Sequence, residues 1–315
     1  APKRTEKLII GLISGLALYE ISKFSKIGTN LVQCKADDKK KVYAPGEAIG
    51  EGLRANLWLA KYPNVKSLEM VEDSPLIIFL SHVRNANSNG EKFKFMADRL
   101  LHAIIDAATV ELPNDSEAEF EVPGGVTVQG TLLDEEGPTC AMVLLQDSES
   151  LSVFEEKKLA GGIWAKALTE TFQPKELMHG HLAIKNISNV HDFSIPTDIS
   201  TASTIFLLAS EVAGGEVICE AVKYLSNVGI GVEKIVLICS TISKDACEKA
   251  CNSFPALRIV AGAVDPSVDS KGDVVPGIGG LHLRYEGSLS GKDRNGPKTG
   301  DGTKKSLLKA LFGSK

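Results

Sequence analysis

The sequence lacks the residue patterns that identify several large classes of enzyme. Its six cysteines include no C-x-x-C pair. Cys247 and Cys251, four residues apart on an expected helix, have no second pair of cysteines or histidines to complete a metal site. There is no G-x-G-x-x-G fingerprint, and neither Ser203 nor Ser210 belongs to a Ser-His-Asp arrangement. We therefore expect no metal site and no serine nucleophile, and the unpaired cysteines favour a reducing compartment.

The chain also has little that could cross a membrane, and we expect no transmembrane span. The N-terminal apolar run, residues 8–18, is only eleven residues long and is followed by Glu20 and Lys23, which is too short to span a bilayer. Such a segment suits a docked helix, a peripheral membrane contact or a remnant of a targeting sequence. The chain starts at Ala1 without Met, which fits Met removal or loss of a presequence. We expect an organelle, either a chloroplast or a mitochondrion, with the cytoplasm as the alternative.

Acidic residues are scarce at both ends of the chain. The 315 residues carry a net charge of −5, yet residues 1–44 contain nine Lys or Arg against four Asp or Glu, and residues 286–315 contain seven against three. The central part is therefore acidic. Because phosphate contacts need clustered cations, we expect no nucleic-acid groove on the body. The basic ends are the expected contact points for partners or anionic surfaces, and solvated tails are the alternative.

These composition shifts divide the chain into three parts. We expect an N-terminal arm over residues 1–45, a main domain over residues 46–285, and a basic flexible tail over residues 286–315 with a short amphipathic end at residues 306–312. The whole chain has 43% hydrophobic and 24% charged residues, which is enough apolar content to bury a full core.

Within this domain, apolar runs alternate with helical patterns. The strongest amphipathic helix is expected over residues 90–108, and a hairpin or flap around the PGG at residues 123–125. Strands alternating with helices of this length imply a parallel sheet in an α/β layer, whose ligands lie beyond the carboxyl ends of the strands. The expected strands are residues 140–145, 181–184, 205–208, 235–239 and 258–263, and the expected helices are residues 155–171, 216–227 and 244–253.

The most informative stretch is residues 204–216, which have the order of a phosphate-binding strand, loop and helix. An apolar strand is followed by Gly214 and Gly215, which allow backbone to approach a ligand, and then by a helix. A site for a sugar pyrophosphate and a metal requires carboxylates at the strand end and a Thr or Ser in the loop. Those positions hold Leu208, Ala209, Ala213 and Glu216.

Three segments together resemble the uracil phosphoribosyltransferase family. LASEVAGGE (residues 208–216) is similar to the family's D-P-M-L-A-T-G-G-S. FPALRIVAGAVD (residues 254–265) and GDVVPGIGGLHLR (residues 272–284) are similar to F-P-x-V-x-I-x-x-A-A-V-D and G-Y-I-V-P-G-L-G-D-x-G-D-R. Weaker matches follow in the same order from residue 75 onward, including EVPGGVTVQG (residues 121–130) as the flap. The resemblance implies a phosphoribosyltransferase-like parallel sheet flanked by helices, with a flap hairpin and terminal extensions.

The departures from the family motifs bear on catalysis. In the family, the loop acids contact the ribose hydroxyls and the Thr and small residues hold the 5-phosphate, and the matching residues here are Leu208, Ala213 and Glu216. A glutamate at a helix N-terminus is a good cap and a poor neighbour for a phosphate. The pyrophosphate loop is also changed, because Arg-Ala-Gly is replaced by Gln146, Asp147 and Ser148. The cations that remain at matching positions are Arg84 and Lys185.

The segment that reads the uracil edge in the family is better preserved. Its backbone groups correspond to Val274, Val275, Pro276 and Gly277, whereas Gly280 replaces an Asp. These residues form a possible base pocket. The alternative is that they simply form a turn that closes the sheet.

The resemblance and its departures lead to one main expectation. The chain is expected to be a non-catalytic structural or assembly subunit, in a homo- or hetero-oligomer or larger complex contacted through the arm and the tail. No cofactor is expected. An active transferase that makes UMP from uracil and phosphoribosyl pyrophosphate with Mg²⁺ is one alternative, and a uracil- or UMP-responsive regulatory module is another. Changing Glu216→Ser is expected to lower stability by about 1 kcal/mol through loss of a cap-like interaction.

Overall fold

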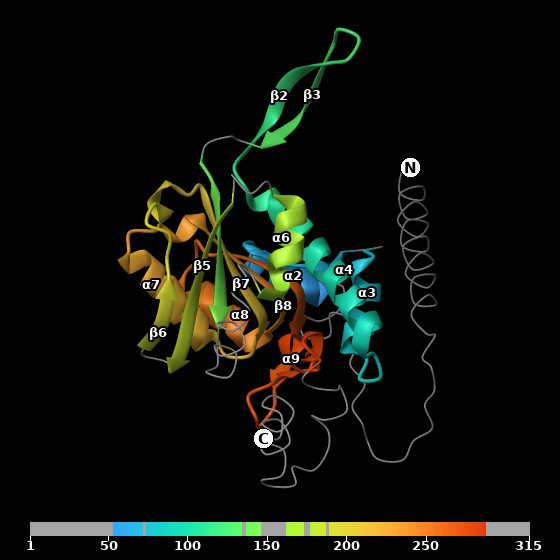
Figure 1. Ribbon diagram of the computed structural model, residues 1–315, viewed down its shortest axis with the longest axis vertical. Helices are drawn as coiled ribbons and strands as arrows, with labels where there is room; N and C mark the ends of the chain where they lie inside the picture. Colours follow the sequence, from blue (N-terminus) through green and yellow to red (C-terminus); the bar gives the residue numbers. More distant parts are fainter. Residues whose placement is uncertain are drawn as a thin grey trace, which may run out of the picture. The chain divides into compact units, whose positions relative to one another are not determined.

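A mixed, mainly parallel sheet forms the centre of the described chain (Figure 1). The computed structural model describes residues 53–71, 74–133, 137–145, 162–172, 177–186 and 189–287. Seven strands of this part pair in the order β1-β9-β8-β7-β4-β5-β6. Their bounds are β1 Val65–Ser67, β4 Thr139–Leu145, β5 Leu177–Asn186, β6 Asn189–Ser194, β7 Thr204–Val212, β8 Ile235–Ser243 and β9 Arg258–Asp265.

Most neighbouring strands of this sheet run parallel. Every pair from β1 to β5 in this order is parallel, and β6 runs antiparallel to β5. Strands β4 and β8 are buried at every position, as expected for parallel strands that are covered on both faces. The five strands predicted from apolar runs are confirmed, whereas the short strand β1 and the polar strand β6 were not predicted.

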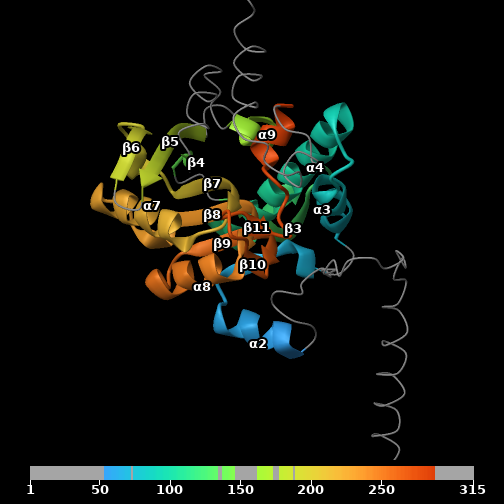
Figure 2. The same cartoon turned by 90° about the horizontal axis from the view of Figure 1, so that it is seen from below.

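Helices cover both faces of the sheet (Figure 2). Side chains of α2, α7 and α8 pack with one face of the central strands. Side chains of α3, α4, α6 and α9 pack with the other face. The bounds are α2 Leu53–Lys61, α3 Leu76–Arg84, α4 Gly90–Ala108, α6 Ala165–Thr171, α7 Gly215–Asn227, α8 Lys244–Ser253 and α9 Leu281–Tyr285. No helix in the described ranges is both long enough and apolar enough to span a bilayer.

The long helix α4 has the bounds predicted for it. Its buried residues recur at helical spacing and include Phe93, Ala97, Leu100 and Ile104. This stripe lies against the sheet, so the amphipathic pattern alone located the helix. Only the end of the helix predicted over residues 155–171 falls in the described ranges, as α6.

The predicted hairpin is formed by β2 (Asn114–Val122) and β3 (Val126–Leu133), which pair antiparallel across the PGG turn. It extends away from the sheet and its covering helices (Figure 1). A second two-stranded pair, β10 (Ser267–Val268) with β11 (Val274–Val275), lies in the segment before α9.

Strand β7 is longer than predicted. We expected it to end at Leu208, but it continues to Val212, which pairs in register with Ile242 of β8. Because β7 takes up most of the expected loop, only Ala213 and Gly214 separate the strand from α7. This shortening decides where the predicted site residues lie.

Candidate functional site

Two of the predicted phosphate-site residues belong to the core. Leu208 is 0% exposed and Ala209 is 1% exposed, and they pack on opposite faces of the sheet. The backbone that follows is held onto β8, because the Ser240 and Ser243 hydroxyls donate to the carbonyl oxygens of Ser210 and Ala213. Side chains at positions 208 and 209 therefore contribute packing, and the sheet holds the next three residues extended.

The glycine pair marks the start of α7 and its contact with α8. A Cβ added to Gly215 would lie 3.0 Å from the carbonyl oxygen of Ala246 and 3.0 Å from Cβ of Lys249. A side chain at this position would therefore push α7 away from α8. Close packing of the two helices is a sufficient reason for glycine at position 215, without any ligand.

Glu216 places its carboxylate at the N-terminus of α7. It forms an ion pair with Lys249 of α8, and it accepts a hydrogen bond from its own backbone N–H. These two contacts, with the Lys249 hydrogen bond first, hold the pKa of Glu216 below its usual value. A Cβ added to Gly214 would be 2.9 Å from Oε2 of Glu216, so the carboxylate lies beside the loop where a phosphate was expected.

Sequence reasoning missed the carboxylate with the most hydrogen bonds in this region. Oε1 of Glu211 accepts from the backbone N–H groups of Ile278 at 2.7 Å and Gly279 at 3.2 Å. Oε2 accepts from those of Gly280 at 2.7 Å and Leu281 at 2.8 Å. Two of these donors, on Gly279 and Gly280, are presented by backbone in the left-handed region, with φ of 81° and 83°, where glycine is favoured.

The same segment is held from its carbonyl side by Arg284. Its Nη1 donates to the carbonyl oxygens of Ile278 at 2.7 Å and Val83 at 2.5 Å, and its guanidinium lies 4.2 Å from the centre of the Phe93 ring. Arg284 is buried, and this burial lowers the pKa of its guanidinium. Ile278 therefore donates its N–H to a carboxylate and offers its C=O to a cation.

A third charged contact fixes Gly277. Oδ2 of Asp265 accepts from the Gly277 N–H at 3.0 Å, and Oδ1 accepts from Nη2 of Arg84 at 2.6 Å. Burial raises the pKa of Asp265, with the Arg84 charge opposing it. Arg84, one of the cations considered for ligand binding, is thus paired within the chain.

The structure brings the possible base-pocket residues together with Glu211 and Asp265. Val274 and Val275 form β11, and Pro276 leads into the backbone that these two carboxylates bind. The N–H groups of Gly277 and Gly280 both donate to them. The predicted pyrophosphate-loop residues Gln146, Asp147 and Ser148 lie outside the described residues, as does the side chain of Lys185.

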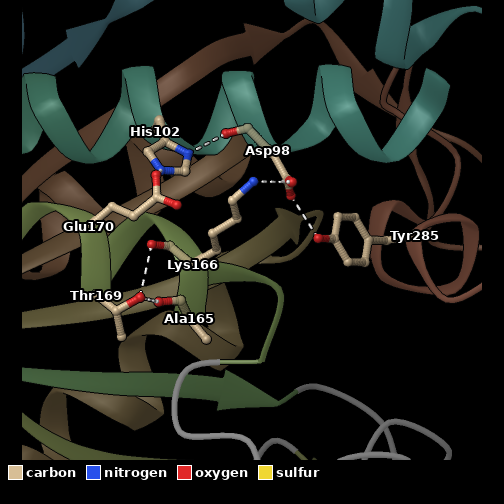
Figure 3. A network of polar contacts seen from close by, with 7 residues as sticks. All are labelled: Asp98, His102, Ala165, Lys166, Thr169, Glu170 and Tyr285. Carbon is tan, nitrogen blue, oxygen red and sulfur yellow. Dashed lines mark hydrogen bonds and ion pairs between the residues drawn. The ribbon is translucent and has the colours of Figure 1, made fainter. Parts of the chain in front are cut away.

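A polar network ties the end of this segment to the helices over the sheet (Figure 3). Asp98 of α4 accepts from the Tyr285 hydroxyl at 2.6 Å and from Nζ of Lys166 at 2.9 Å. Burial and the Asp98 hydrogen bond raise the pKa of Tyr285. His102, one turn further along α4, lies 2.6 Å from Glu170 of α6. Asp98 therefore links α4 to both α6 and α9, and His102 adds a second link between α4 and α6.

No group of three or more His, Cys, Asp or Glu side chains within the described ranges has the arrangement of a metal site. Cys247 and Cys251 lie on α8 as predicted, with Cys247 buried and Cys251 half-buried. The hydrogen bond with Cys251, followed by burial, raises the pKa of Cys247. These two thiols are free and stand one helical turn apart.

The parallel sheet covered on both faces, the projecting hairpin and the strand, short loop and helix at β7–α7 define a phosphoribosyltransferase-like α/β protein. A solved structure of the AQ2163 protein from Aquifex aeolicus has this fold, with a TM-score of 0.52 and 15% identity, covering 70% of this chain and 97% of that one. The family model for uracil phosphoribosyltransferase matches residues 71–285, and the chain belongs to this family.

Individual relatives agree with this assignment at low identity. Uracil phosphoribosyltransferase 1 of Schizosaccharomyces pombe is 25% identical over 206 residues, which are 65% of this chain and 88% of the relative. The chloroplastic uracil phosphoribosyltransferase of Arabidopsis thaliana is 32% identical over 93 residues, which are 30% and 31% of the two chains. The family resemblance inferred from three motifs is thus confirmed.

Proposed function

We propose that this protein is a non-catalytic member of the uracil phosphoribosyltransferase family and serves as a subunit of a larger assembly. The observation that carries the proposal is the carboxylate of Glu216, which lies at the N-terminus of α7 and is paired with Lys249. The N-terminus of a helix after a strand and a short loop is where a phosphate would receive backbone N–H groups. Here that position already has a negative charge.

The energetic consequence is large for a ligand as anionic as phosphoribosyl pyrophosphate. Two like charges about 4 Å apart repel by roughly 4 kcal/mol at an effective dielectric of about 20, which corresponds to about three decades of affinity. The Lys249 ammonium, which is paired with the same carboxylate, offsets part of this repulsion. Leu208 and Ala209 offer no oxygen that could bind a sugar hydroxyl or a magnesium ion.

The hairpin supports a role in assembly. Its pairing puts Ala118, Phe120 and Val122 of β2 opposite Gly130, Val128 and Val126 of β3 on one face, whereas Glu119 and Glu121 pair with Gln129 and Thr127 on the other. Phe120 is 37% exposed and Val126 is 60% exposed. An isolated two-stranded hairpin is marginally stable in water, and this apolar face has no helix of its own chain over it in the described ranges.

We propose that the apolar hairpin face packs against another subunit, and that the basic segments 1–45 and 286–315 add contacts to the same complex. An organelle is the proposed location, because one relative with a local 32% match is a chloroplastic enzyme. The expected absence of a cofactor belongs to this proposal, since Mg²⁺ would be needed only for transfer to uracil.

Isothermal titration with phosphoribosyl pyrophosphate and Mg²⁺ tests the loss of catalysis. The full chain is expected to give no heat of binding at micromolar concentrations. An assay with radiolabelled uracil is expected to give no UMP, with the Saccharomyces cerevisiae relative as the positive control. Binding at micromolar strength, or turnover by the pure protein, would overturn the proposal.

The assembly role is tested separately by native mass spectrometry and cross-linking in a lysate of the source. Val126→Lys places a charge on the apolar hairpin face, and Thr127→Lys places the same charge on the opposite face. We expect Val126→Lys to release the protein from its complex and Thr127→Lys to leave it bound. Equal retention of both variants would contradict a contact through this face.

A further inference from the structure

Glu211 is a charged residue in a strand that is otherwise buried or half-buried. Its neighbours along β7 pack into both faces of the sheet, and a carboxylate in such a place needs strong partners to offset its loss of water. Four backbone N–H groups, from Ile278 to Leu281, supply them at 2.7 to 3.2 Å. Hydrogen bonds to a charged acceptor are about twice as strong as neutral ones.

The arrangement of donors matches a carboxylate rather than a general acceptor. Two consecutive N–H groups donate to Oε1, and the next two donate to Oε2. Three of the four donors precede α9, so the contact belongs to the loop itself. A planar group with two oxygens on one carbon satisfies all four donors at once.

The Glu211 contact joins two segments that the family resemblance links to ligand binding. The donors belong to the segment that the family resemblance makes a possible base pocket, and the acceptor comes from β7, just before the 213–214 loop. The side chain therefore links the two segments that a nucleotide would have to touch together. Gly277 is fixed beside it by Asp265, so five consecutive N–H groups, from Gly277 to Leu281, have carboxylate partners within the chain.

We propose that Glu211 is a built-in ligand of residues 278–281, an autoinhibitory contact that occupies their backbone N–H groups and keeps them from any external molecule. Removing the Glu211 carboxylate leaves an array that accepts a small carboxylate from solution. The proposal builds on the proposed loss of catalysis, but the two fail separately. UMP formation would overturn the proposed function, whereas the test below concerns only the carboxylate and its donors.

Chemical rescue in the full chain provides this test. Glu211→Ala is expected to lower the midpoint of thermal unfolding by roughly 10 °C, because four donors lose a charged acceptor. Adding roughly 0.2 M sodium formate should restore about 2 °C or more relative to the same concentration of sodium chloride. Glu216→Ala removes a nearby carboxylate that has a half-exposed ion pair, so formate should not raise its midpoint above the chloride control.

A second measurement keeps the test decisive if Glu211→Ala does not fold. In the unmodified protein, the amides of Ile278–Leu281 should be protected from hydrogen exchange, and Glu211→Gln should increase their exchange at least tenfold. Glu216→Gln should leave those amides unchanged. Fast exchange of these amides in the unmodified protein would overturn the proposal, as would formate effects that are the same in the two alanine variants.

Discussion

Glu216 and Glu211 each bring a carboxylate to backbone N–H groups, but in different settings. Glu216 lies at the start of a helix with its side chain 40% exposed, and its partner Lys249 is 47% exposed. Glu211 is in a buried strand and accepts from four N–H groups that are contributed by distant residues. Exposed ion pairs contribute little to stability, whereas a half-buried carboxylate with four backbone donors joins two distant segments. Glu216 adds a negative charge at the start of α7, whereas Glu211 fixes the conformation of residues 278–281.

The largest loss of stability is expected when Arg284, which binds a carbonyl group of the 278–281 segment, is replaced. Arg284→Ala removes the guanidinium that binds the carbonyl oxygens of Val83 and Ile278 and leaves buried carbonyls without a donor. The free energy of unfolding should fall by about 3 kcal/mol or more, as measured by urea denaturation. Arg99→Ala is the control, because Arg99 lies 5.4 Å from the Phe79 ring and such contacts contribute about 0.5–1 kcal/mol. Equal losses would mean that Arg284 does not hold the loop.

A smaller effect is expected at the junction of α7 and α8. Gly215→Ala places a Cβ against the backbone of Ala246 and should lower the free energy of unfolding by about 1–2 kcal/mol. Gly214→Ala meets only the end of the flexible Glu216 side chain, so its loss should be under about 1 kcal/mol. Chemical denaturation of both variants measures the difference. A larger loss for Gly214→Ala would show that the first glycine is the constrained one.

Glu216→Ser should have a modest effect on stability. The sequence alone suggested a loss of about 1 kcal/mol, but the exposure of the Glu216–Lys249 pair reduces the expected value to about 0.5 kcal/mol. High salt should reduce the loss further, because exposed pairs are screened. A large loss of stability that does not depend on salt would mean that Glu216, like Glu211, is a structural carboxylate rather than a partner in an exposed ion pair.

The smallest effect is a difference in pH dependence between two carboxylates. The folded pKa of Glu216 is lowered, so its contribution is present above its unfolded value near 4.5 and is lost as the pH falls through the folded value. The folded pKa of Asp265 is raised above 3.8, so its contribution decreases as the pH rises through that range. Relative to Glu216→Gln, the unmodified protein should therefore lose stability on acidification between roughly pH 5 and pH 3, and relative to Asp265→Asn it should gain. Denaturant unfolding across this pH range measures the free energy of unfolding of the unmodified protein and both variants. If all three depended on pH in the same way, both predictions would be contradicted.

Much of the fold could be predicted from the sequence because the relevant signals are local. The stripe on α4 repeats with the helical period, and β4, β8 and β9 are continuous apolar runs, as is typical of buried parallel strands. Strand β6 escaped prediction because an edge strand with the sequence NVHDFS needs no apolar run. The end of β7 was also mispredicted, since ASEV is held extended by pairing with β8 rather than by its own preference.

The candidate site was less predictable because its contacts are non-local. The sequence placed Glu216 at a helix start, but nothing in it indicated Lys249 as the partner. Glu211 went unnoticed although it carried a signal, since a carboxylate inside the run TIFLLASEV must find partners when the strand is buried. The PGIGG segment (residues 276–280) also carried a signal, because a glycine-rich loop outside a helix or sheet offers backbone N–H groups to an acceptor. Pairing these two features would have required knowing that the end of β7 lies beside residues 278–281.

The contact of Glu211 also has a consequence for the order in which the chain matures. Its four donors follow it by 67 to 70 positions, and β8, α8 and β9 lie between them. During synthesis, these four hydrogen bonds therefore cannot form until the last described helix has left the ribosome. Closure of this long loop is a late event, so a nascent chain that stops before residue 278 lacks all four of these donors to Glu211.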